Sequence, residues 1–446
     1  MKHIDGEWIT RFAQGTSYAA TIETKLRADN LDEKKSAFFD DTSKNPDLIP
    51  TIEIETMHKK RSDLEKLRDD IEYGENDVSV REAYLPRIEG LLGNIALLNA
   101  SSKGDTDEFI HRNIESYGEV DSSVFNASLE FFRTKAEKAL AEARKGSALA
   151  ISAQQVIDVL PEGHAVFSGP TAAEFDGVKS PVNEQLDEMM DGIELPDSIS
   201  GKVGLRIAQQ AMDNLGFGYT AIPQKEGLTT MSAEHLKKVI KIPQSVKYTA
   251  PRFRGMMGHE GFVHINESIQ GAQQPLEILK KGLAGYLGAS EGKGILFEQV
   301  QYASMDEFRE TPRFHDVVRR LLAVGLGRGT DGNGERDFTE VFKIVNAIDF
   351  MSELQKQHRS IAAASQAAKD RTWELMAMRT HRGYTGRGAT SMKDKIYAEQ
   401  NPVQWNFITA HPDIIPYLNV GKYDASNEVH LNLLKKTGSI PGDIAV

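Results

Sequence analysis

The 446-residue sequence contains no cysteine. This absence excludes disulfide bonds, thiolate zinc ligands, iron–sulfur clusters and cysteine nucleophiles, so any bound metal must be held by His, Asp or Glu. Positive charge is also in short supply, because the formal net charge is −12. A balance of this sign argues against general binding to nucleic acids or to anionic membranes.

Long hydrophobic runs are absent as well. No stretch approaches the roughly 20 apolar residues that a membrane span requires. The first residues are polar and acidic where a signal peptide needs an apolar run, so we expect a cytoplasmic protein with no membrane partner. The glycine-rich segment 325–334 lacks the Gly-Lys-Ser/Thr ending of a phosphate-binding loop and is interpreted as an ordinary loop.

Hydrophobic periodicity predicts an α+β fold that is mostly α-helical. Apolar residues recur at helical spacing over 51–72 and through much of 80–146. A further helix is predicted to begin near residue 151, with Ser152 as its N-cap. Short β-like runs separated by turns at 216–249 predict a small sheet. After Pro251 the pattern is helical almost to the end of the chain.

We expect the chain to consist of two parts. Residues 1–75 are predicted to be an N-terminal extension of helices and loops, and residues 76–446 to form one larger domain. Within that domain, residues 161–202 are acidic and rich in loop-forming residues. They are predicted to be a loop-rich insertion.

The strongest chemical signal is the hexapeptide His259-Glu260-Gly261-Phe262-Val263-His264. In the common zincin motif the two histidines are four residues apart on one helical face, with an adjacent glutamate as general base. Here they are five apart, which leaves the imidazoles about 140° apart around a regular helix. One extra residue accommodated as a π-bulge would restore a facing arrangement, and the flanking Gly258 permits irregular backbone.

A catalytic zinc ion usually takes three protein ligands and leaves a fourth position for water. Without cysteine, the downstream candidates for the third ligand are Glu267, Glu277, Glu291 and Glu298. The sequence predicts a helix over 275–287, a turn at 288–290 and a second helix. Glu291 would then lie where a reversed chain returns to the hexapeptide, and Glu298, one to two turns further on, remains the main alternative.

The segments around this motif resemble a known family. HEGFVH, followed by QQPLEILKKGLAGY and SEG, closely resembles the QEGLA-motif family. Its bacterial members are labelled flavohemoglobin expression-modulating, and its animal members include the microtubule-associated tyrosine carboxypeptidases, which remove the last tyrosine of α-tubulin. Later blocks resemble the family in the same order: FIHRNIESYG (109–118), RTHRG (379–383), SMKDKIY (391–397) and VGKYDASNEVHLNLLKKTG (420–438).

The resemblance, which covers about residues 80–440, implies a zincin-like metallopeptidase with one zinc ion per chain. It implies His259, His264 and Glu291 as zinc ligands and Glu260 as the general base. The expected reaction is hydrolysis of the C-terminal residue, tyrosine or another aromatic, of a protein or peptide. A zinc endopeptidase and a non-hydrolytic regulatory protein that retains the zinc site are the alternatives. Glu260 argues against the second, since a structural site needs no base.

The chain departs from the family at one place. Where the family has Gln-Glu-Gly-Leu-Ala, the sequence reads Ser290-Glu291-Gly292-Lys293-Gly294. The proposed ligand and its glycine remain, whereas a cation and a second glycine replace the small apolar pair. We expect these changes to affect substrate preference and the packing of the ligand helix.

Two further groups are needed for the implied reaction. The oxyanion needs a donor besides the metal. Tyr397, which a buried core position would explain equally well, and His381 are the candidates. A terminal carboxylate is well matched by arginine through its two-pronged geometry. Arg379, Arg382 and Lys393, in the blocks that resemble the family, are the candidates for substrate binding.

Overall fold

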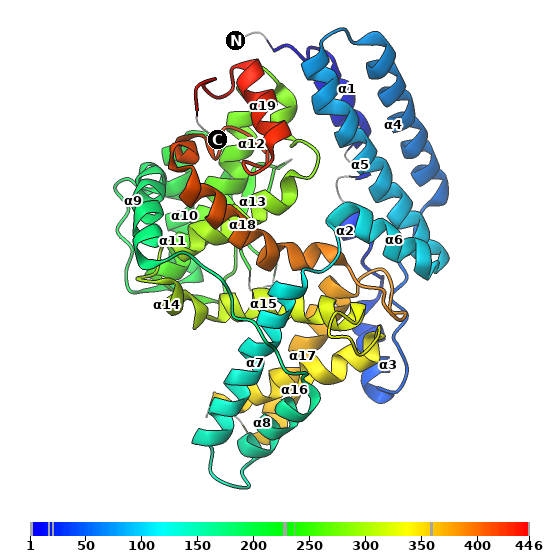
Figure 1. Cartoon of the computed structure of the whole chain (residues 1–446), viewed down its shortest axis with the longest axis vertical. Helices are drawn as coiled ribbons and strands as arrows, with labels where there is room; N and C mark the ends of the chain where they lie inside the picture. Colours follow the sequence, from blue (N-terminus) through cyan, green and yellow to red (C-terminus); the bar gives the residue numbers. More distant parts are fainter. Residues whose placement is uncertain are drawn as a thin grey trace.

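The computed structural model describes residues 3–16, 18–19, 22–225, 230–235, 237–356 and 360–444. In these ranges the chain is predominantly helical with short strands in two small sheets, so the predicted mostly helical α+β class is confirmed (Figure 1). Parts of the predicted N-terminal extension (residues 1–2, 17 and 20–21) and of the predicted sheet (226–229 and 236) lie outside the described residues. None of the described helices is both long and apolar enough to cross a membrane.

The N-terminal helices form one side of the molecule in Figure 1. They are α1 (Trp8–Thr16), α2 (Ile22–Lys25), α3 (Leu31–Asp40), α4 (Ile54–Gly74), α5 (Val78–Lys103) and α6 (Thr106–Tyr117). The buried carboxylate of Asp5 accepts hydrogen bonds from the Tyr84 hydroxyl at 2.8 Å and from the Ile278 backbone N–H at 2.9 Å. These bonds tie the first residues to α5 and to a segment near the middle of the chain.

A second group of helices packs around its own hydrophobic cluster at the lower end of the view. It comprises α7 (Ser122–Glu142), α8 (Ala148–Val159), α15 (Pro312–Arg328), α16 (Phe338–Gln355) and α17 (Ile361–Leu375). The prediction of Ser152 as an N-cap is wrong, because α8 is capped by Ser147, whose hydroxyl accepts from the Ala150 N–H. Ser152 is buried inside that helix.

The glycine-rich segment 325–334 differs from the predicted loop over its first residues. They belong to α15, which continues to Arg328 and ends at Gly329 with φ 68°. A Cβ on Gly325 would come within 2.2 Å of the Phe125 ring. The glycine thus serves close packing of α15 on α7 at this point rather than a loop.

The predicted loop-rich insertion at 161–202 contains a helix, α9 (Ala172–Met189). It begins with a capping box, in which the Thr171 hydroxyl and the Glu174 carboxylate satisfy each other's backbone N–H groups. Its buried residues recur at helical spacing: Phe175, Val178, Val182, Leu186 and Met189. Pro181 inside the helix and the surrounding acidic residues conceal this pattern in the sequence.

The small sheet predicted at 216–249 is confirmed. Strand β4 (Val239–Ile242) is central, parallel to β2 (Thr220–Pro223) and antiparallel to β3 (Ser232–Glu234). A separate pair joins β1 (Ser198–Ser200) to β5 (Lys247–Thr249), and α10 (Gly201–Leu215) packs against both sheets. Strand β3 lies at the edge of its sheet and contacts the hexapeptide segment.

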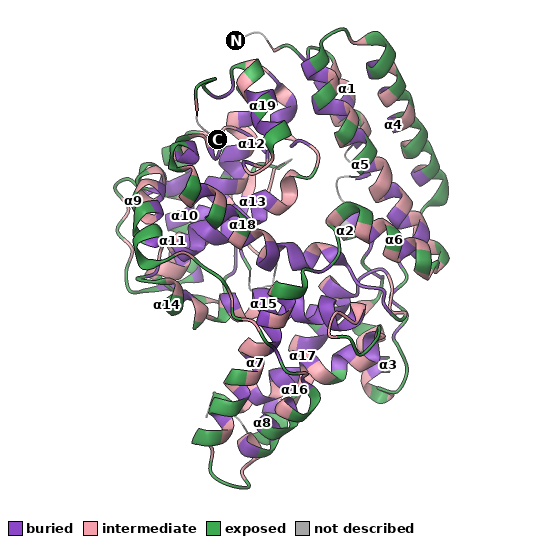
Figure 2. Cartoon of the chain, viewed as in Figure 1, coloured by how far each residue is buried: buried purple, intermediate pink, exposed green. Residues whose placement is uncertain are grey.

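The hexapeptide lies in a long helical stretch made of α11 (Ala250–Met257), the π-helix η2 (Gly258–Ile265) and α12 (Asn266–Ala272). Helix α13 (Tyr286–Gln299) packs between η2 and α18 (Ile396–Ala410). Every residue of α13 from 289 to 299 is buried, and Figure 2 shows this helix in the interior.

Two glycines permit this close packing. A Cβ on Gly292 would lie 2.8 Å from the Gln400 carbonyl oxygen of α18, and a Cβ on Gly294 would lie 2.6 Å from the His259 ring of η2. Such distances are too short for any side chain, so α13 can approach both neighbours only through glycine.

The chain reverses its direction just before α13, at an earlier position in the sequence than predicted. In place of a helix over 275–287, the 3-10 helix η3 (Glu277–Lys280) is followed by Gly282 at φ 97° and Gly285 at φ 76°. These left-handed glycines complete the reversal, so α13 begins at Tyr286 and no turn occurs at 288–290. The remaining elements are α14 (Met305–Arg309), η4 (Met376–Thr380), η5 (Met392–Lys395), η6 (Pro412–Tyr417) and α19 (Glu428–Thr437).

Candidate metal centre

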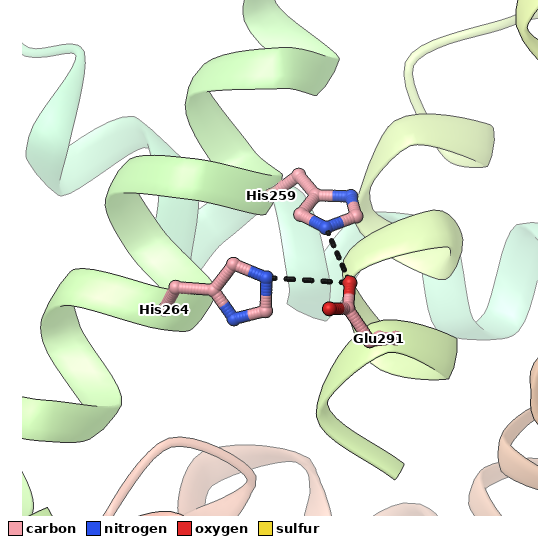
Figure 3. A group of neighbouring side chains, drawn as sticks. All are labelled: His259, His264 and Glu291. Carbon is pink, nitrogen blue, oxygen red and sulfur yellow. Dashed lines mark hydrogen bonds and ion pairs between the residues drawn. The ribbon is translucent and has the colours of Figure 1, made fainter. Parts of the chain in front are cut away.

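The π-helix η2 brings the two histidines together, as the five-residue spacing predicts. The ring centroids of His259 and His264 are 4.9 Å apart, and both Nε2 atoms face the carboxylate of Glu291 on α13 (Figure 3). His259 Nε2 lies 3.3 Å and His264 Nε2 3.5 Å from Glu291 Oε2. One ligand atom from each of the three residues can be chosen so that all lie within 4.8 Å of one another, which makes this a group that could hold a metal ion.

The electrostatics of the group suit a cation. His259 is 3% exposed and Glu291 7%. Burial opposes ionisation of Glu291, but its bonds to His259 and His264 outweigh burial and hold the pKa of its carboxyl well below the usual range. A buried carboxylate that stays ionised between two imidazoles creates a position where positive charge is stabilised.

Glu298, the alternative third ligand, lies behind His259 instead. His259 Nδ1 donates to Glu298 Oε1 at 2.6 Å, which leaves Nε2 facing Glu291. Arg313 holds Glu298 in a two-pronged contact, with both N···O distances 2.9 Å. Burial opposes ionisation of this carboxyl too, but the charge of Arg313 lowers its pKa to about 2. Glu298 is thus an ionised acceptor that orients His259.

A second buried chain of contacts orients His264. Its Nδ1 lies 3.1 Å from Ser290 Oγ, and the Ser290 hydroxyl donates to Glu267 Oε2 at 2.8 Å. Glu267 Oε1 pairs with Lys293 Nζ at 2.6 Å, and Lys293 Nζ also donates to the Leu418 carbonyl at 2.7 Å. Ser290, Glu267 and Lys293 are fully buried. We call these three residues the His264 network.

The two departures from the family pattern, Ser290 and Lys293, therefore meet in one network through Glu267. The sequence predicts that these departures affect substrate preference and the packing of the ligand helix. In the structure the Lys293 ammonium is enclosed and neutralised by a carboxylate. An influence on substrate preference stays a prediction, whereas the contact of Ser290 with His264 is direct.

Glu260 lies beside the metal centre and next to the edge strand. Its Oε2 accepts a hydrogen bond from the Ala233 backbone N–H of β3 at 3.1 Å. Glu260 and His259 line a cavity of about 300 Å³. The residues that line this cavity also include five arginines: Arg252, Arg313, Arg319, Arg371 and Arg379.

The two candidate oxyanion donors lie in different surroundings. Burial and the charge of Glu291 raise the pKa of Tyr397, so its hydroxyl keeps its proton at neutral pH; its side chain lines a separate small cavity and not the one beside Glu260. His381 is fully buried in the second group of helices, packs on Phe338 at a centroid distance of 5.5 Å, and does not line the cavity. Burial lowers its pKa to about 3.

The three cations predicted to bind substrate are also separated. Arg379 lines the cavity beside Glu260. Arg382 is buried and donates to Asp394 at 2.9 Å. Lys393 lines a different groove, between α5 and the start of α13, although its charge acts on Glu291.

Sequence reasoning missed the residues that support this site from a distance. Arg313 comes from α15 and Arg371 from α17, both far along the chain from the hexapeptide. Only the fold brings these helices to the cavity, and no local pattern marks either residue.

The fold and the site together define a helical protein with a buried His–His–Glu group beside an arginine-rich cavity. The family model described as microtubule-associated tyrosine carboxypeptidase matches residues 205–442, which include the hexapeptide and Glu291. The match covers more than half of the chain, so the chain belongs to this family, and the resemblance predicted from the sequence is confirmed. The family description supports a peptidase activity. No curated protein and no solved structure matches the chain.

Proposed function

We propose that this protein is a zinc-dependent metallocarboxypeptidase with a zincin-like catalytic domain, acting on the C-terminus of a protein or peptide. The observation that carries the proposal is the convergence of His259, His264 and Glu291 with Glu260 beside them. Two histidines and a glutamate are a donor set that catalytic zinc sites use, and they leave a fourth position for water.

The distances support zinc. Two ligands at about 2.1 Å from a tetrahedral ion lie about 3.4 Å from each other. The separations from Glu291 Oε2 to His259 Nε2 and His264 Nε2 are 3.3 and 3.5 Å. Both histidines also have their Nδ1 atoms engaged by other side chains, which directs Nε2 toward the common point.

When bound, zinc would supply a Lewis acid that lowers the pKa of a water molecule and polarises the scissile carbonyl. Glu260 acts as the general base: the Ala233 N–H holds Oε2, and Oε1 accepts the proton and passes it to the leaving amine. Tyr397 keeps its proton and donates a hydrogen bond to the oxyanion.

The alternatives differ in what they require of the site. A purely structural zinc site has no use for an ionisable base in a cavity, and Glu260 lines one. An endopeptidase would need room for substrate on both sides of the metal. The domain limits, with residues 1–75 as an extension and 76–446 as the catalytic domain, form part of the same proposal.

The test combines metal content with product identity. We expect about one zinc per chain by mass spectrometry, and a sharp fall in His259→Ala and in Glu291→Ala. Glu260→Gln should retain zinc and lose cleavage, whereas Glu55→Gln, at an exposed position of α4, should change neither.

Products of a peptide library distinguish the alternatives. Peptides shortened by one C-terminal residue support the carboxypeptidase, and internal cuts support the endopeptidase. A zinc-loaded protein that cleaves no peptide would contradict the enzymatic proposal and favour a regulatory role.

A further inference from the structure

Four of the five arginines of the cavity beside Glu260 fall into two groups, and the fifth, Arg252, lies over the Tyr248 ring at 5.4 Å. Arg313 and Arg319 are fully engaged by carboxylates: Arg313 by Glu298 in the two-pronged contact, and Arg319 by Asp349 at 2.5 Å and Asp316 at 3.2 Å. These residues hold the walls of the cavity. Their charges are already neutralised by close partners.

Arg371 and Arg379 are only loosely paired. The nearest carboxylate oxygen to Arg371 in the described part of the chain is that of Asp349 at 3.7 Å, and this oxygen already accepts from Arg319. The nearest to Arg379 is that of Asp394 at 4.0 Å. Neither distance is a hydrogen bond. The two side chains are 30% and 31% exposed and line the cavity.

The cavity is lined by five arginines and four carboxylates (Glu260, Glu298, Asp316 and Glu374), so its lining has an excess of one positive charge. The charge of Arg320, followed by burial, lowers the pKa of Arg379. Burial, followed by the charge of Arg319, lowers the pKa of Arg371. A bound anion would relieve this repulsion, so the cavity is electrostatically prepared for one.

Arg371 and Arg379 come from successive helical segments and line the same cavity. Arg371 lies in α17 and Arg379 eight residues later in the π-helix η4, which continues α17. Eight residues of regular α-helix would leave them about 80° apart. The π-helical turn, which holds an additional residue, reduces this offset. The π-helical turn thus favours placing both arginines on the side of the helix that lines the cavity.

We propose that Arg371 and Arg379 form the binding site for the α-carboxylate of the last residue of the substrate. Two guanidinium groups that have no carboxylate within hydrogen-bond distance among the described residues match the two oxygens of a carboxylate. The site lies beside the base, because the same cavity is lined by Glu260. It also lies beside the candidate metal centre, because His259 lines the same cavity.

The size of the cavity supports a terminal residue rather than an internal stretch of chain. A volume of about 300 Å³ is at the small end of binding pockets. It would hold one residue beyond the scissile bond. The inference rests on the proposed carboxypeptidase function and adds the residues that make it act at chain ends.

The experiment compares one peptide with a free C-terminal carboxylate and the same peptide with a C-terminal amide. In Arg371→Gln and Arg379→Gln we expect kcat/KM for the free acid to fall roughly 10- to 100-fold, and the slower cleavage of the amide to change little. Zinc content should stay near one per chain, because neither arginine contacts a ligand. An equal loss for acid and amide, or a loss of zinc, would overturn the assignment.

Two matched variants test other cations. Arg252→Gln changes another arginine of the cavity, one that lies over the Tyr248 ring at 5.4 Å. Lys393→Met changes a cation of the separate groove. Both should leave the ratio of acid to amide cleavage unchanged. If either lowers that ratio and the Arg371 and Arg379 variants do not, the carboxylate binds elsewhere.

A third peptide tests whether the arginines recognise the terminal α-carboxylate or the carboxylate of a side chain. It carries a C-terminal amide and a glutamate as its last residue. If the Arg371 and Arg379 variants lose as much toward this peptide as toward the free acid, the arginines recognise a side chain and the assignment to the α-carboxylate is wrong.

A binding measurement keeps this inference separate from the proposed hydrolysis. Zinc-loaded Glu260→Gln should bind the free acid more tightly than the amide in calorimetry, and adding Arg371→Gln should remove that preference. Preferential binding without cleavage by the wild type would contradict hydrolysis and still support the carboxylate site. Absence of the preference in Glu260→Gln would overturn the carboxylate site alone.

Discussion

Replacing Lys293 by methionine tests the His264 network. Lys293 and Glu267 are both fully buried and their charges lie 2.6 Å apart. Methionine keeps most of the side-chain volume but removes the ammonium, which leaves a buried carboxylate without its cation. Breaking a buried ion pair at one partner costs about 3–5 kcal/mol, because the remaining charge is uncompensated. We expect the free energy of unfolding to fall by this amount.

The second partner supplies the control. Glu267→Gln in the Lys293→Met background removes the uncompensated charge, and the amide oxygen of the glutamine can still accept the hydrogen bond from the Ser290 hydroxyl. Replacing both members of a buried pair by neutral groups is often nearly neutral, so the double variant should recover most of the lost stability. The coupling energy of the double-mutant cycle should be about 2 kcal/mol or more.

The assay is urea unfolding of the metal-free protein, followed by zinc competition with a chromophoric chelator. Because Ser290 connects Glu267 to His264, Lys293→Met should also weaken zinc binding about 10- to 100-fold, and the double variant should restore part of it. A change in stability below about 0.5 kcal/mol in Lys293→Met, which is typical of exposed surface sites, would refute the buried ion pair.

Three further predictions address other parts of the fold. Glu298→Gln should retain the zinc ligands but lower zinc affinity about 10- to 100-fold, since it weakens the acceptor for His259 Nδ1; unchanged affinity in chelator competition would rule out an orienting role. The folded-state pKa of His381 is lowered to about 3, so its contribution to stability is present above the unfolded value of about 6.5 and is lost as the pH falls from there to about 3. His381→Gln should therefore reduce the acid-induced loss of stability by on the order of 3 kcal/mol, and parallel pH profiles for variant and wild type would contradict this. Thr171→Ala removes the N-cap of α9 and should cost about 1 kcal/mol in denaturant unfolding, whereas a neutral result would mean that the capping box is not formed.

The convergence of His259, His264 and Glu291 in the candidate metal centre was largely predictable, because the spacing of the two histidines is anomalous. A five-residue separation of two histidines is incompatible with one face of a regular helix, so a shared ligand requires the π-helical turn that Gly258–Ile265 adopts. The third ligand was harder. Glu291 and Glu298 are seven residues apart and thus share one face of α13, and both contact His259. Whether Glu291 or Glu298 also reaches His264 depends on how α13 packs against η2, and no local sequence pattern specifies that packing.

Other features could not be predicted because they depend on distant partners. The three arginines Arg313, Arg319 and Arg371 are ordinary in sequence, and their roles follow from which carboxylates the fold places within reach. Helix α9 was missed for a local reason. Its glycine, proline and acidic residues weaken the amphipathic pattern in the sequence, and the helix is recognised only from the burial of its apolar side chains in the fold.

The way α13 fits against its neighbours restricts how this segment can evolve. Leucine at position 293 would strand the charge of Glu267, and alanine at position 294 would collide with the His259 ring. Glutamine at position 290 would displace the hydroxyl that joins His264 to Glu267. Each step toward the family's Gln-Glu-Gly-Leu-Ala is therefore harmful when taken alone. Substitutions at positions 290, 293 and 294 should therefore be non-additive, because their side chains share the partners Glu267, His259 and His264.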